Sequence, residues 1–523
     1  MFGHALDALL LVTVLAAPWA ALFLALFPFR DLLRRERTWF LLLAAGLWLL
    51  FTGLLSPLTE TFAQATIHAA AKPWFAAYVH AIIEDVRAPL WLSHLGSGLP
   101  ALANPYVGYM SPFTSLLLLF QDLDHGVNVL VLVHLVFAGC SVFLLGRSLG
   151  LSRLPSLFAV LPFLWNPWVF GKLGIGIHAL YIFGYAWIPL TWVVLLHFLR
   201  TRRLLDAARA GIPLAWMAIS MPTVFAQMLF AVLFVAIAVP ISRVFRRPWR
   251  VLGKVMVSVV LIVAGAFLTA APEHLAAREL LPLNTENRFG IVRMGGWRDL
   301  DLSGRDFLRA LFPNELGNVL FGKAGRAQAF GVPFSPGDLV VLLAMLGFVF
   351  TLKHPALRSR FHPLAHLALF LTVASVATHG VFYEPMMRGY PLWAASGNFP
   401  VVGALLLVSM TPSVAAGVEA LLGGAKTLGR HVALRIQRTR MFFGSRWGQG
   451  SFLERTAAGV FSVLIIGVLS TELLWGVRQT IQVVRGRDPD RHLDLRFSIP
   501  VLPLSHLRRA PHLEFLREVS AND

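Results

Sequence analysis

The chain has 523 residues, 57% of them hydrophobic and only 14% charged, and its mean hydropathy is +0.69. A soluble protein of this length could not bury so much apolar surface behind a mostly polar exterior, so the composition excludes a water-soluble enzyme. The formal charge of +18 does not indicate nucleic acid, because Lys and Arg gather in short segments between apolar runs, as in the cytoplasmic loops of membrane proteins.

Apolar runs long enough to cross about 30 Å of hydrocarbon recur along the whole chain. The first run lacks preceding basic residues and is too long for a signal peptide, so we interpret it as a retained helix. The run at 114–120 is too short to span. We expect an all-α polytopic integral membrane protein with about twelve transmembrane helices, near residues 9–27, 39–55, 127–145, 154–170, 180–199, 210–221, 224–241, 251–271, 338–352, 364–377, 401–422 and 457–477.

Basic residues predict the orientation of these helices. Arg30, Arg34, Arg35 and Arg37 follow the first run and mark its inner end, and later inner loops are basic in the same way. This pattern predicts extracytoplasmic termini and two ordered outer loop regions, at about residues 56–113 and 272–337. The first outer region is expected to be partly helical around residues 74–86. Residues 478–523 have mixed charge and several prolines, which indicates a short extramembrane C-terminal arm.

The stretch from Arg87 to Pro112 is dense in Pro, Gly, Trp, Tyr and Asn, although apolar segments flank it. Such a loop is stiff and rich in turns, and its rings can stack on a flat ligand. Four of its residues are therefore candidates for substrate binding: Trp91, His94, Asn104 and Tyr106.

Several short motifs, taken in order, resemble one family of membrane proteins. The pieces Pro89-Leu-Trp91, Gly96-Ser-Gly98-Leu-Pro100, Ala103-Asn-Pro105 and Ser111-Pro112 resemble the first outer loop of YfhO-type proteins of the GT-C glycosyltransferase superfamily. The resemblance continues through His134–Gly139, Leu145–Arg153, Leu164–Trp168, Ala186–Leu190, Ala271–Glu273, Leu311–Asn314 and Gly331–Phe334. It implies a GT-C-like transmembrane domain over residues 39–477. Residues 1–38 are then an extra N-terminal transmembrane helix with its basic inner loop.

The resemblance implies a membrane glycosyltransferase that transfers a sugar from a polyprenyl-phosphate donor to an envelope acceptor, on the outer face of the bacterial inner (cytoplasmic) membrane. Such enzymes place an acidic side chain in the first outer loop, where it takes up the proton of the acceptor hydroxyl. A basic side chain would stabilise the departing phosphate. No cofactor is firmly implied. A divalent metal has no supporting pattern, and Cys140, the single cysteine, excludes a multi-cysteine metal site.

The acid that the resemblance leads us to expect is missing, because the stretch Ala65–Lys72 contains no Asp or Glu. The nearest outer carboxylates are Glu60, Glu84 and Asp85, and these are the candidate catalytic residues. Glu60 closely follows the second helix, where it could lie at a cavity mouth or simply cap a helix. Glu84 and Asp85 also fit a surface pair or helix-end cluster.

Other polar residues are candidates for binding or packing. Arg278 and Arg288 are the first choices for a lipid phosphate, because a guanidinium offers paired donors, although a solvated loop would also carry arginines. His134 lies inside an apolar run and is expected to make an interhelical hydrogen bond rather than to catalyse or bind metal. Gly139 is expected to permit close helix packing.

Three functions remain open from the sequence. The first is the glycosyltransferase, whose partners are membrane lipid and a polyprenyl-phosphate sugar. The second is a non-catalytic GT-C-fold structural or assembly subunit, with other membrane protein subunits as partners; the missing acid, the short tail and the added helix favour it. The third is a lipid-linked sugar carrier. The sequence gives it little support, because the predicted spans hold few charged residues that could line a pathway.

Overall fold

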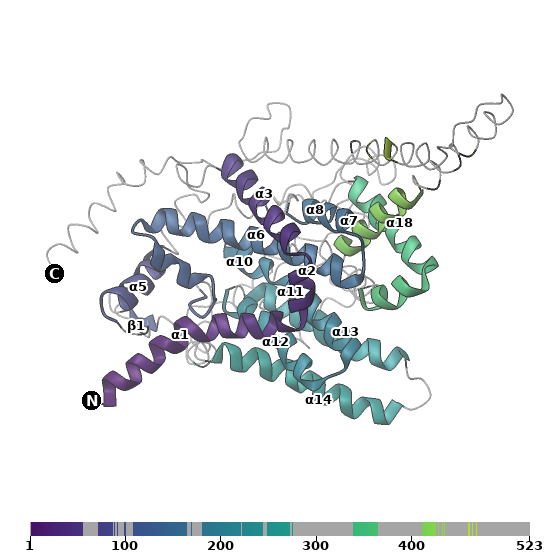
Figure 1. Cartoon of the computed structure of the whole chain (residues 1–523). Coiled ribbons are helices and arrows are strands. Elements are labelled where there is room, and N and C mark those ends of the chain that lie inside the picture. Colours follow the sequence, from purple (N-terminus) through teal and green to yellow (C-terminus); the bar gives the residue numbers. More distant parts are fainter. Residues whose placement is uncertain are drawn as a thin grey trace, which may run out of the picture.

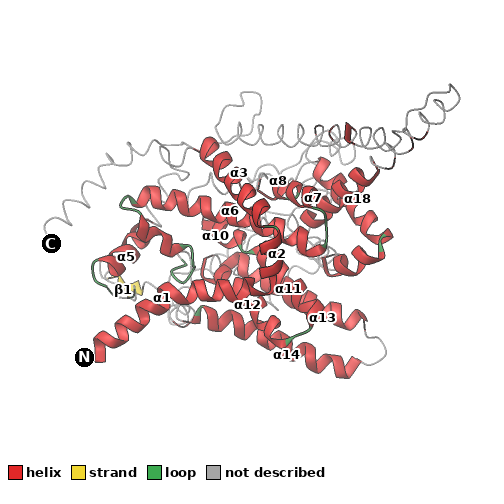
Figure 2. Ribbon diagram, in the orientation of Figure 1, coloured by secondary structure: helices red, strands yellow, loops and turns green. Residues whose placement is uncertain are grey.

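The computed structural model describes part of the chain, and that part is built from helices (Figure 1). The described residues are 2–55, 72–86, 88, 91–92, 99–100, 108–164, 169, 180–220, 222–243, 248–271, 275, 338–364, 410–424 and single positions from 427 to 467. The strands among these residues are one pair of two residues each, and short loops and turns join the elements (Figure 2). The mostly helical fold expected from the sequence is therefore confirmed for this part of the chain.

The chain begins with two apolar helices joined by a basic turn. α1 (Phe2–Leu26) continues through the 3-10 helix η1 (Phe27–Phe29) into α2 (Arg30–Arg35), and α3 (Arg37–Leu55) starts after Glu36. Large apolar side chains on these helices are exposed, among them Phe23 and Leu49. Water penalises such exposure and hydrocarbon does not, so this surface fits the interior of a membrane.

Three described helical stretches are long and apolar enough to cross a membrane: Leu11–Arg35, Leu123–Leu149 and Ile182–Thr201. Shorter apolar helices accompany them, for example Gly253–Thr269. The chain therefore has the features of a helical membrane protein. The count of about twelve crossings stays a prediction, because stretches such as residues 365–409 lie outside the described part.

α6 (Leu123–Leu149) is the central helix of the bundle. Asp122 caps its start by accepting a hydrogen bond from the amide of Asp124 at 2.9 Å. Gly150 ends it at φ +89°, a conformation that glycine adopts most easily. At 1.5 Å per residue, α6 is about 40 Å long, which is enough to cross the hydrocarbon of a bilayer.

Prolines break two of the predicted crossings. The run predicted at 154–170 starts as α7 (Arg153–Phe158) and α8 (Val160–Leu164), and the run at 180–199 is α10 (Leu180–Ala186) followed by α11 (Ile188–Thr201). Pro162 and Pro189 follow the two breaks. Because proline has no N–H to donate to the carbonyl four residues earlier, each run forms two helices rather than one.

Glycines bring pairs of helices into backbone contact. A Cβ added to Gly211 of α12 (Leu204–Ser220) would meet the Ile262 carbonyl of α14 (Pro248–Thr269), and one added to Gly265 would meet the Ala208 carbonyl. α13 (Pro222–Arg243) packs against both helices.

A backbone contact of the same kind joins α18 (Asp338–Lys353) to the helix at 410–424, and a third glycine lies against a side chain. A Cβ on Gly347 in α18 would meet the backbone of the helix at 410–424, and one on Gly417 would meet α18 in return. At Gly139 in α6 a Cβ would lie 2.5 Å from Leu47 Cδ1, so the close packing expected at this glycine is confirmed.

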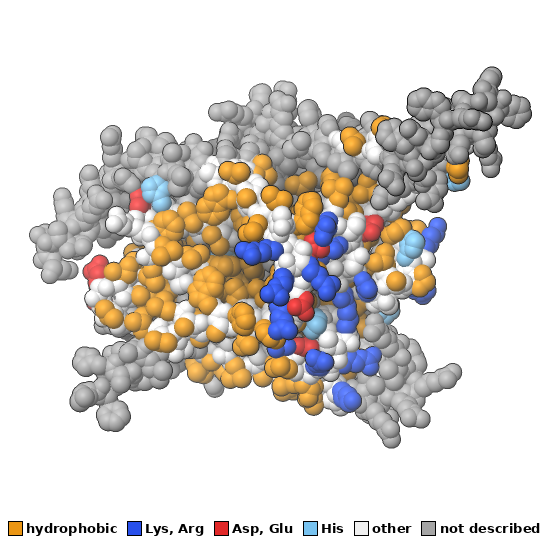
Figure 3. Space-filling view, in the orientation of Figure 1, with side chains coloured by type: hydrophobic (Ala, Val, Ile, Leu, Met, Phe, Trp, Pro, Cys, Tyr) orange, Lys and Arg blue, Asp and Glu red, His pale blue; other side chains and the backbone are white. Residues whose placement is uncertain are grey.

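The two ends of α6 define two faces of the molecule. α5 (Lys72–Ile83) and the 3-10 helix η3 (Thr114–Leu119) pack near the start of α6, and the antiparallel pair β1 (Trp91–Leu92) and β2 (Leu99–Pro100) lies beside α5, at the left of Figure 1. The helix predicted around 74–86 is thus confirmed, ending at Ile83. We call this end the cap face. The opposite end, called the basic face, holds the α2–α3 turn, the end of α6 and the arginines of Figure 3.

Candidate functional site

The predicted first outer segment ends in a loop that enters the helix bundle. The side chains of Tyr109, Met110, Phe113 and Leu117 are all buried. The Phe113 ring lies 5.0 Å from that of His134, which is about three turns into α6. The sequence placed this segment outside the membrane helices as far as residue 113. Its last residues pack among the helices, and the boundary of the outer segment at residue 113 stays a prediction.

Local hydrogen bonds satisfy the backbone of this entering loop. The Thr114 hydroxyl donates to the carbonyl of Gly108 at 2.7 Å, and the Ser115 hydroxyl donates to the carbonyl of Pro112 at 2.7 Å. Gly108 has φ +62°, and a Cβ there would lie 2.9 Å from the Ser220 hydroxyl. Protein surrounds this non-helical backbone and satisfies its polar groups, which is the condition under which such backbone is tolerated within a membrane.

The helix α5 is fastened onto the same loop. The rings of Tyr78 and Tyr109 are stacked, with centroids 5.2 Å apart and planes within 7° of parallel. The Tyr109 hydroxyl donates to the carbonyl of Trp74 at 2.9 Å. Phe75 and Tyr78 of α5 are fully buried. The described part of the predicted outer segment is therefore a cap on one end of the bundle, and its last residues reach in among the helices.

Beneath the cap lies a cluster of buried rings around His134. Its Nδ1 donates to the carbonyl of Leu130 in its own helix at 2.8 Å, and its ring stacks on Phe183 at 4.4 Å. The prediction of an interhelical hydrogen bond at His134 was wrong, because the side chain that contacts it from the neighbouring helix α10 is the apolar ring of Phe183. Trp187 and Trp216 continue the cluster at 4.4 Å from each other.

Polar atoms of this ring cluster are buried without a partner. Within the described part of the chain, His134 Nε2 and the indole N–H groups of Trp187 and Trp216 make no hydrogen bond. Buried polar groups are usually satisfied, so these unpaired atoms depart from the usual pattern.

Two of the candidate acids lie together at the end of α5. His80 Nε2 is 3.1 Å from a Glu84 carboxylate oxygen, and His80 Nδ1 is 3.6 Å from one of Asp85. The Glu84 side chain is 66% exposed and that of Asp85 30% exposed. This geometry is a helix-end cluster on the cap face. An imidazole between two carboxylates can also relay a proton, so the arrangement suits acid–base chemistry as well.

The other candidates are not tested by the described residues. Trp91 lies in β1, where its backbone pairs with Pro100. Among the described residues, no group of three or more His, Cys, Asp or Glu side chains could hold a metal ion. The remaining candidates lie outside the described part of the chain: Glu60, His94, Asn104, Tyr106, Arg278 and Arg288.

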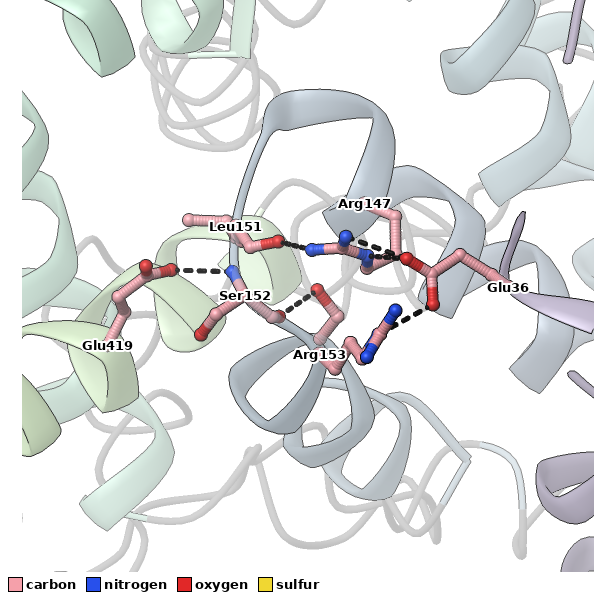
Figure 4. A network of polar contacts seen from close by, with 7 residues as sticks. Glu36, Arg147, Leu151, Ser152, Arg153 and Glu419 are labelled. Carbon is pink, nitrogen blue, oxygen red and sulfur yellow. Dashed lines mark hydrogen bonds and ion pairs between the residues drawn. The ribbon is translucent and has the colours of Figure 1, made fainter. Parts of the chain in front are cut away.

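On the basic face, one buried carboxylate joins separate helices (Figure 4). Glu36 is 3% exposed and accepts hydrogen bonds from Arg147 Nη2 at 2.8 Å and from Arg153 Nε at 2.9 Å. The Arg147 guanidinium also donates to the carbonyl of Leu151. These contacts tie the α2–α3 turn to the turn between α6 and α7. From the other side, the Glu419 carboxylate in the helix at 410–424 accepts the Ser152 amide at 3.0 Å.

The arginines keep this carboxylate ionised. Burial by itself raises the pKa of Glu36, but the hydrogen bonds and charges of Arg147 and Arg153 outweigh it and hold the pKa below its usual value. Asp206 follows the same pattern: burial is outweighed by hydrogen bonds from Thr201 at 2.6 Å and Arg209 at 2.7 Å, and its pKa is lowered. Glu36 therefore links separate helices as an anion, and Asp206 connects the end of α11 at Thr201 to Arg209 of its own helix.

The network explains a motif that the sequence identified only through resemblance. In the stretch Leu145–Arg153, a Cβ on Gly146 would lie 2.7 Å from the Ser156 hydroxyl, and Gly150 provides the left-handed turn. The two arginines of the motif both bind Glu36. Glu36 was not predicted from the sequence, although an acid within a run of arginines between two apolar helices is a visible signal.

Among known proteins, the chain is similar to a solved structure but matches no family model. No model of a known protein family matches the chain, and no curated protein matches it. Among solved structures, the chain is similar to the oligosaccharyltransferase of Archaeoglobus fulgidus, crystallised with a tethered acceptor peptide that contains an NVT sequon. The TM-score is 0.44 and the identity 14%, and the alignment covers 89% of this chain and 59% of that chain. A similarity of this size does not establish a shared fold, and this chain spans only 59% of that protein's length.

Proposed function

We propose that the chain is a membrane glycosyltransferase of the GT-C type, which transfers a sugar from a polyprenyl-phosphate donor to an envelope acceptor at the cap face. The observation that carries the proposal is the ordered cap, formed by α5 and the entering loop, with carboxylates at its edge and a ring cluster beneath it. The motifs of the outer loop that resemble YfhO-type proteins support the same reading.

The proposed reaction needs two kinds of side chain, a general base for the acceptor hydroxyl and basic residues that bind the leaving phosphate. A carboxylate of Glu60, Glu84 or Asp85 takes up the proton of the acceptor hydroxyl, which makes that oxygen a competent nucleophile. The hydroxyl oxygen then forms the new glycosidic bond, and the polyprenyl phosphate leaves with the bonding electrons. Arg278 and Arg288 are proposed to bind that phosphate, whose negative charge rises as the bond breaks. His80 would hold Glu84 and Asp85 in position.

A transfer assay with the purified full-length chain tests this function. We would incubate it with radiolabelled polyprenyl-phosphate sugars and envelope lipid or polymer acceptors, and compare Glu60→Gln, Glu84→Gln and Asp85→Asn with the parent. We expect transfer by the parent and a loss of about a hundredfold or more in one of the three variants. Asp31→Asn is the control, because Asp31 is an exposed acid on the basic face. Equal activity of all three variants and the control would refute the assigned base.

The alternative is a non-catalytic GT-C-fold subunit of a membrane complex. It is favoured by the lack of acid in the stretch Ala65–Lys72 and by the helix-end pairing of Glu84 and Asp85 with the same histidine. This alternative predicts no transfer with any donor by protein that is folded. It also predicts that the chain migrates from mild detergent extracts in a complex larger than itself.

A further inference from the structure

The basic face carries far more positive than negative charge among its described residues (Figure 3). Its acids are already engaged: Glu36 and Asp206 by arginines, Asp31 by its neighbour Arg30, and Glu419 by a backbone amide. Many arginines are exposed and have no acidic partner within the described ranges: Arg34, Arg35, Arg37, Arg200, Arg202, Arg203, Arg358 and Arg360. The surface therefore has a net attraction for anions.

Aromatic residues place the edge of this face at a membrane boundary. The guanidinium carbons of Arg30 and Arg209 lie 5.1 and 6.0 Å from the centroid of the exposed Phe27 ring. That of Arg153 lies 5.8 Å from the ring of the exposed Trp39. Arginines beside exposed aromatic rings, next to the apolar surface of α1 and α3, are typical of the level of lipid headgroups.

Two arginines from distant segments meet at the end of α6. Arg200 of α11 donates to the carbonyl of Ser148 at 2.8 Å, and Arg360 donates to the carbonyl of Leu149 at 3.1 Å. These carbonyls belong to consecutive residues, so the two positive charges lie within about 10 Å of each other. The negative end of the α6 dipole stabilises both. Each guanidinium uses one of its N–H donors there and keeps others for a second acceptor.

The turn that follows α6 leaves room for the side chain of Arg360. Gly150 has φ +89°, and a Cβ at this position would overlap the Arg360 guanidinium. The missing side chain thus leaves the space that Arg360 occupies. A turn of the motif Leu145–Arg153 is in this way adapted to hold an exposed cation at the membrane boundary.

We propose that the Arg200–Arg360 pair is a binding site for the phosphate of an anionic phospholipid, in the leaflet that borders the basic face. A phosphodiester accepts hydrogen bonds from two guanidinia at once and relieves the repulsion between them. The acyl chains would lie against the exposed apolar side chains of neighbouring helices. The site does not depend on sugar transfer, because it lies at the opposite end of α6 from the cap.

Native mass spectrometry of the full-length protein in detergent tests this site. The probe is short-chain phosphatidylglycerol, with phosphatidylcholine of the same chain length as the neutral lipid and glycerol phosphate as the free phosphate. We compare the parent with Arg200→Gln, Arg360→Gln and Gly150→Ala. The last keeps every charge and displaces Arg360. The matched control is Arg37→Gln, an exposed arginine of the same face with no hydrogen bond or ion pair to either arginine of the site.

The site predicts a specific pattern of affinities. Phosphatidylglycerol binding should weaken about fivefold or more in each of the three site variants and by less than about twofold in Arg37→Gln. Phosphatidylcholine and glycerol phosphate should bind at least tenfold more weakly than phosphatidylglycerol. Thermal unfolding of each variant, measured in parallel, identifies any variant that fails to fold. Arg360→Gln removes the charge of the site, whereas Gly150→Ala keeps the charge and moves the guanidinium, so the two variants test the site independently.

Three results would overturn the proposal. If Arg37→Gln weakens phosphatidylglycerol binding as much as the site variants do, the lipid is attracted by the overall positive charge of the face and not by a specific site. Equal binding of phosphatidylcholine would show that acyl chains alone are recognised. Tight binding of glycerol phosphate, with loss in the same variants, would assign the pair to a soluble phosphate rather than to lipid.

Discussion

Replacement of Glu36 by glutamine should destabilise the protein more than any exposed charge on the same face. Glu36→Gln keeps the shape of the side chain but leaves Arg147 and Arg153 without their anion. A charge-assisted hydrogen bond contributes about 1.5–3 kcal/mol, and breaking a fully buried ion pair costs about 3–5 kcal/mol. Because the side chains of Arg147 and Arg153 are 20% and 51% exposed, water replaces part of the loss. We expect a loss of about 2–4 kcal/mol.

Equilibrium unfolding in mixed micelles of mild and denaturing detergent measures this loss. Arg147→Gln should cost more than Arg153→Gln, because Arg147 is less exposed, and the double variant Glu36→Gln/Arg147→Gln should cost less than the sum of its parts. Asp31→Asn is the control: its 76% exposed ion pair with Arg30 should contribute less than about 1 kcal/mol. A Glu36→Gln protein as stable as the control, or strictly additive effects, would refute the network as a stabilising junction.

Three further predictions concern pH, helix contact and the cap. Since the folded-state pKa of Glu36 is lowered, its stabilisation should be complete above about pH 4.3 and lost as pH falls through the folded value, so Glu36→Gln should flatten the acid limb of the unfolding curve. Gly265→Ala should destabilise the protein because its Cβ meets backbone, whereas Gly253→Ala, with open space in the same helix, should be neutral or stabilising by about 0.5–1 kcal/mol in the same unfolding assay. Tyr109→Phe should loosen α5, seen as faster amide exchange around Trp74 with little change in α14.

The parts of the fold that could be predicted are those whose structure depends on local sequence alone. The apolar runs gave the long helices, and the helix α5 followed from its composition. The breaks before Pro162 and Pro189 were also visible in principle, because proline cannot donate to the preceding turn. The close contact at Gly139 likewise follows from the small residue alone.

The rest depended on partners far apart in the chain. Phe113 lies inside the bundle because rings of α6 and its neighbours receive it, and the local sequence at 108–120 does not encode those rings. Glu36 binds Arg147 and Arg153 more than a hundred residues away, so the sequence could mark the acid but not identify the arginines that it binds. The candidate site was predictable only as a list of acids and arginines, since their placement depends on tertiary structure.

The orientation of the two faces is the central claim, because the proposed sugar transfer requires the cap face to lie outside the cytoplasmic membrane. After Cys140 is replaced by alanine, single cysteines are introduced as Glu84→Cys on the cap face and Arg203→Cys on the basic face, both at exposed positions. Cells with a permeable outer membrane are then treated with a maleimide that cannot cross the cytoplasmic membrane. We predict that Glu84→Cys is labelled directly and Arg203→Cys only after lysis. Labelling of Arg203→Cys in intact cells, with Glu84→Cys protected until lysis, would contradict the account.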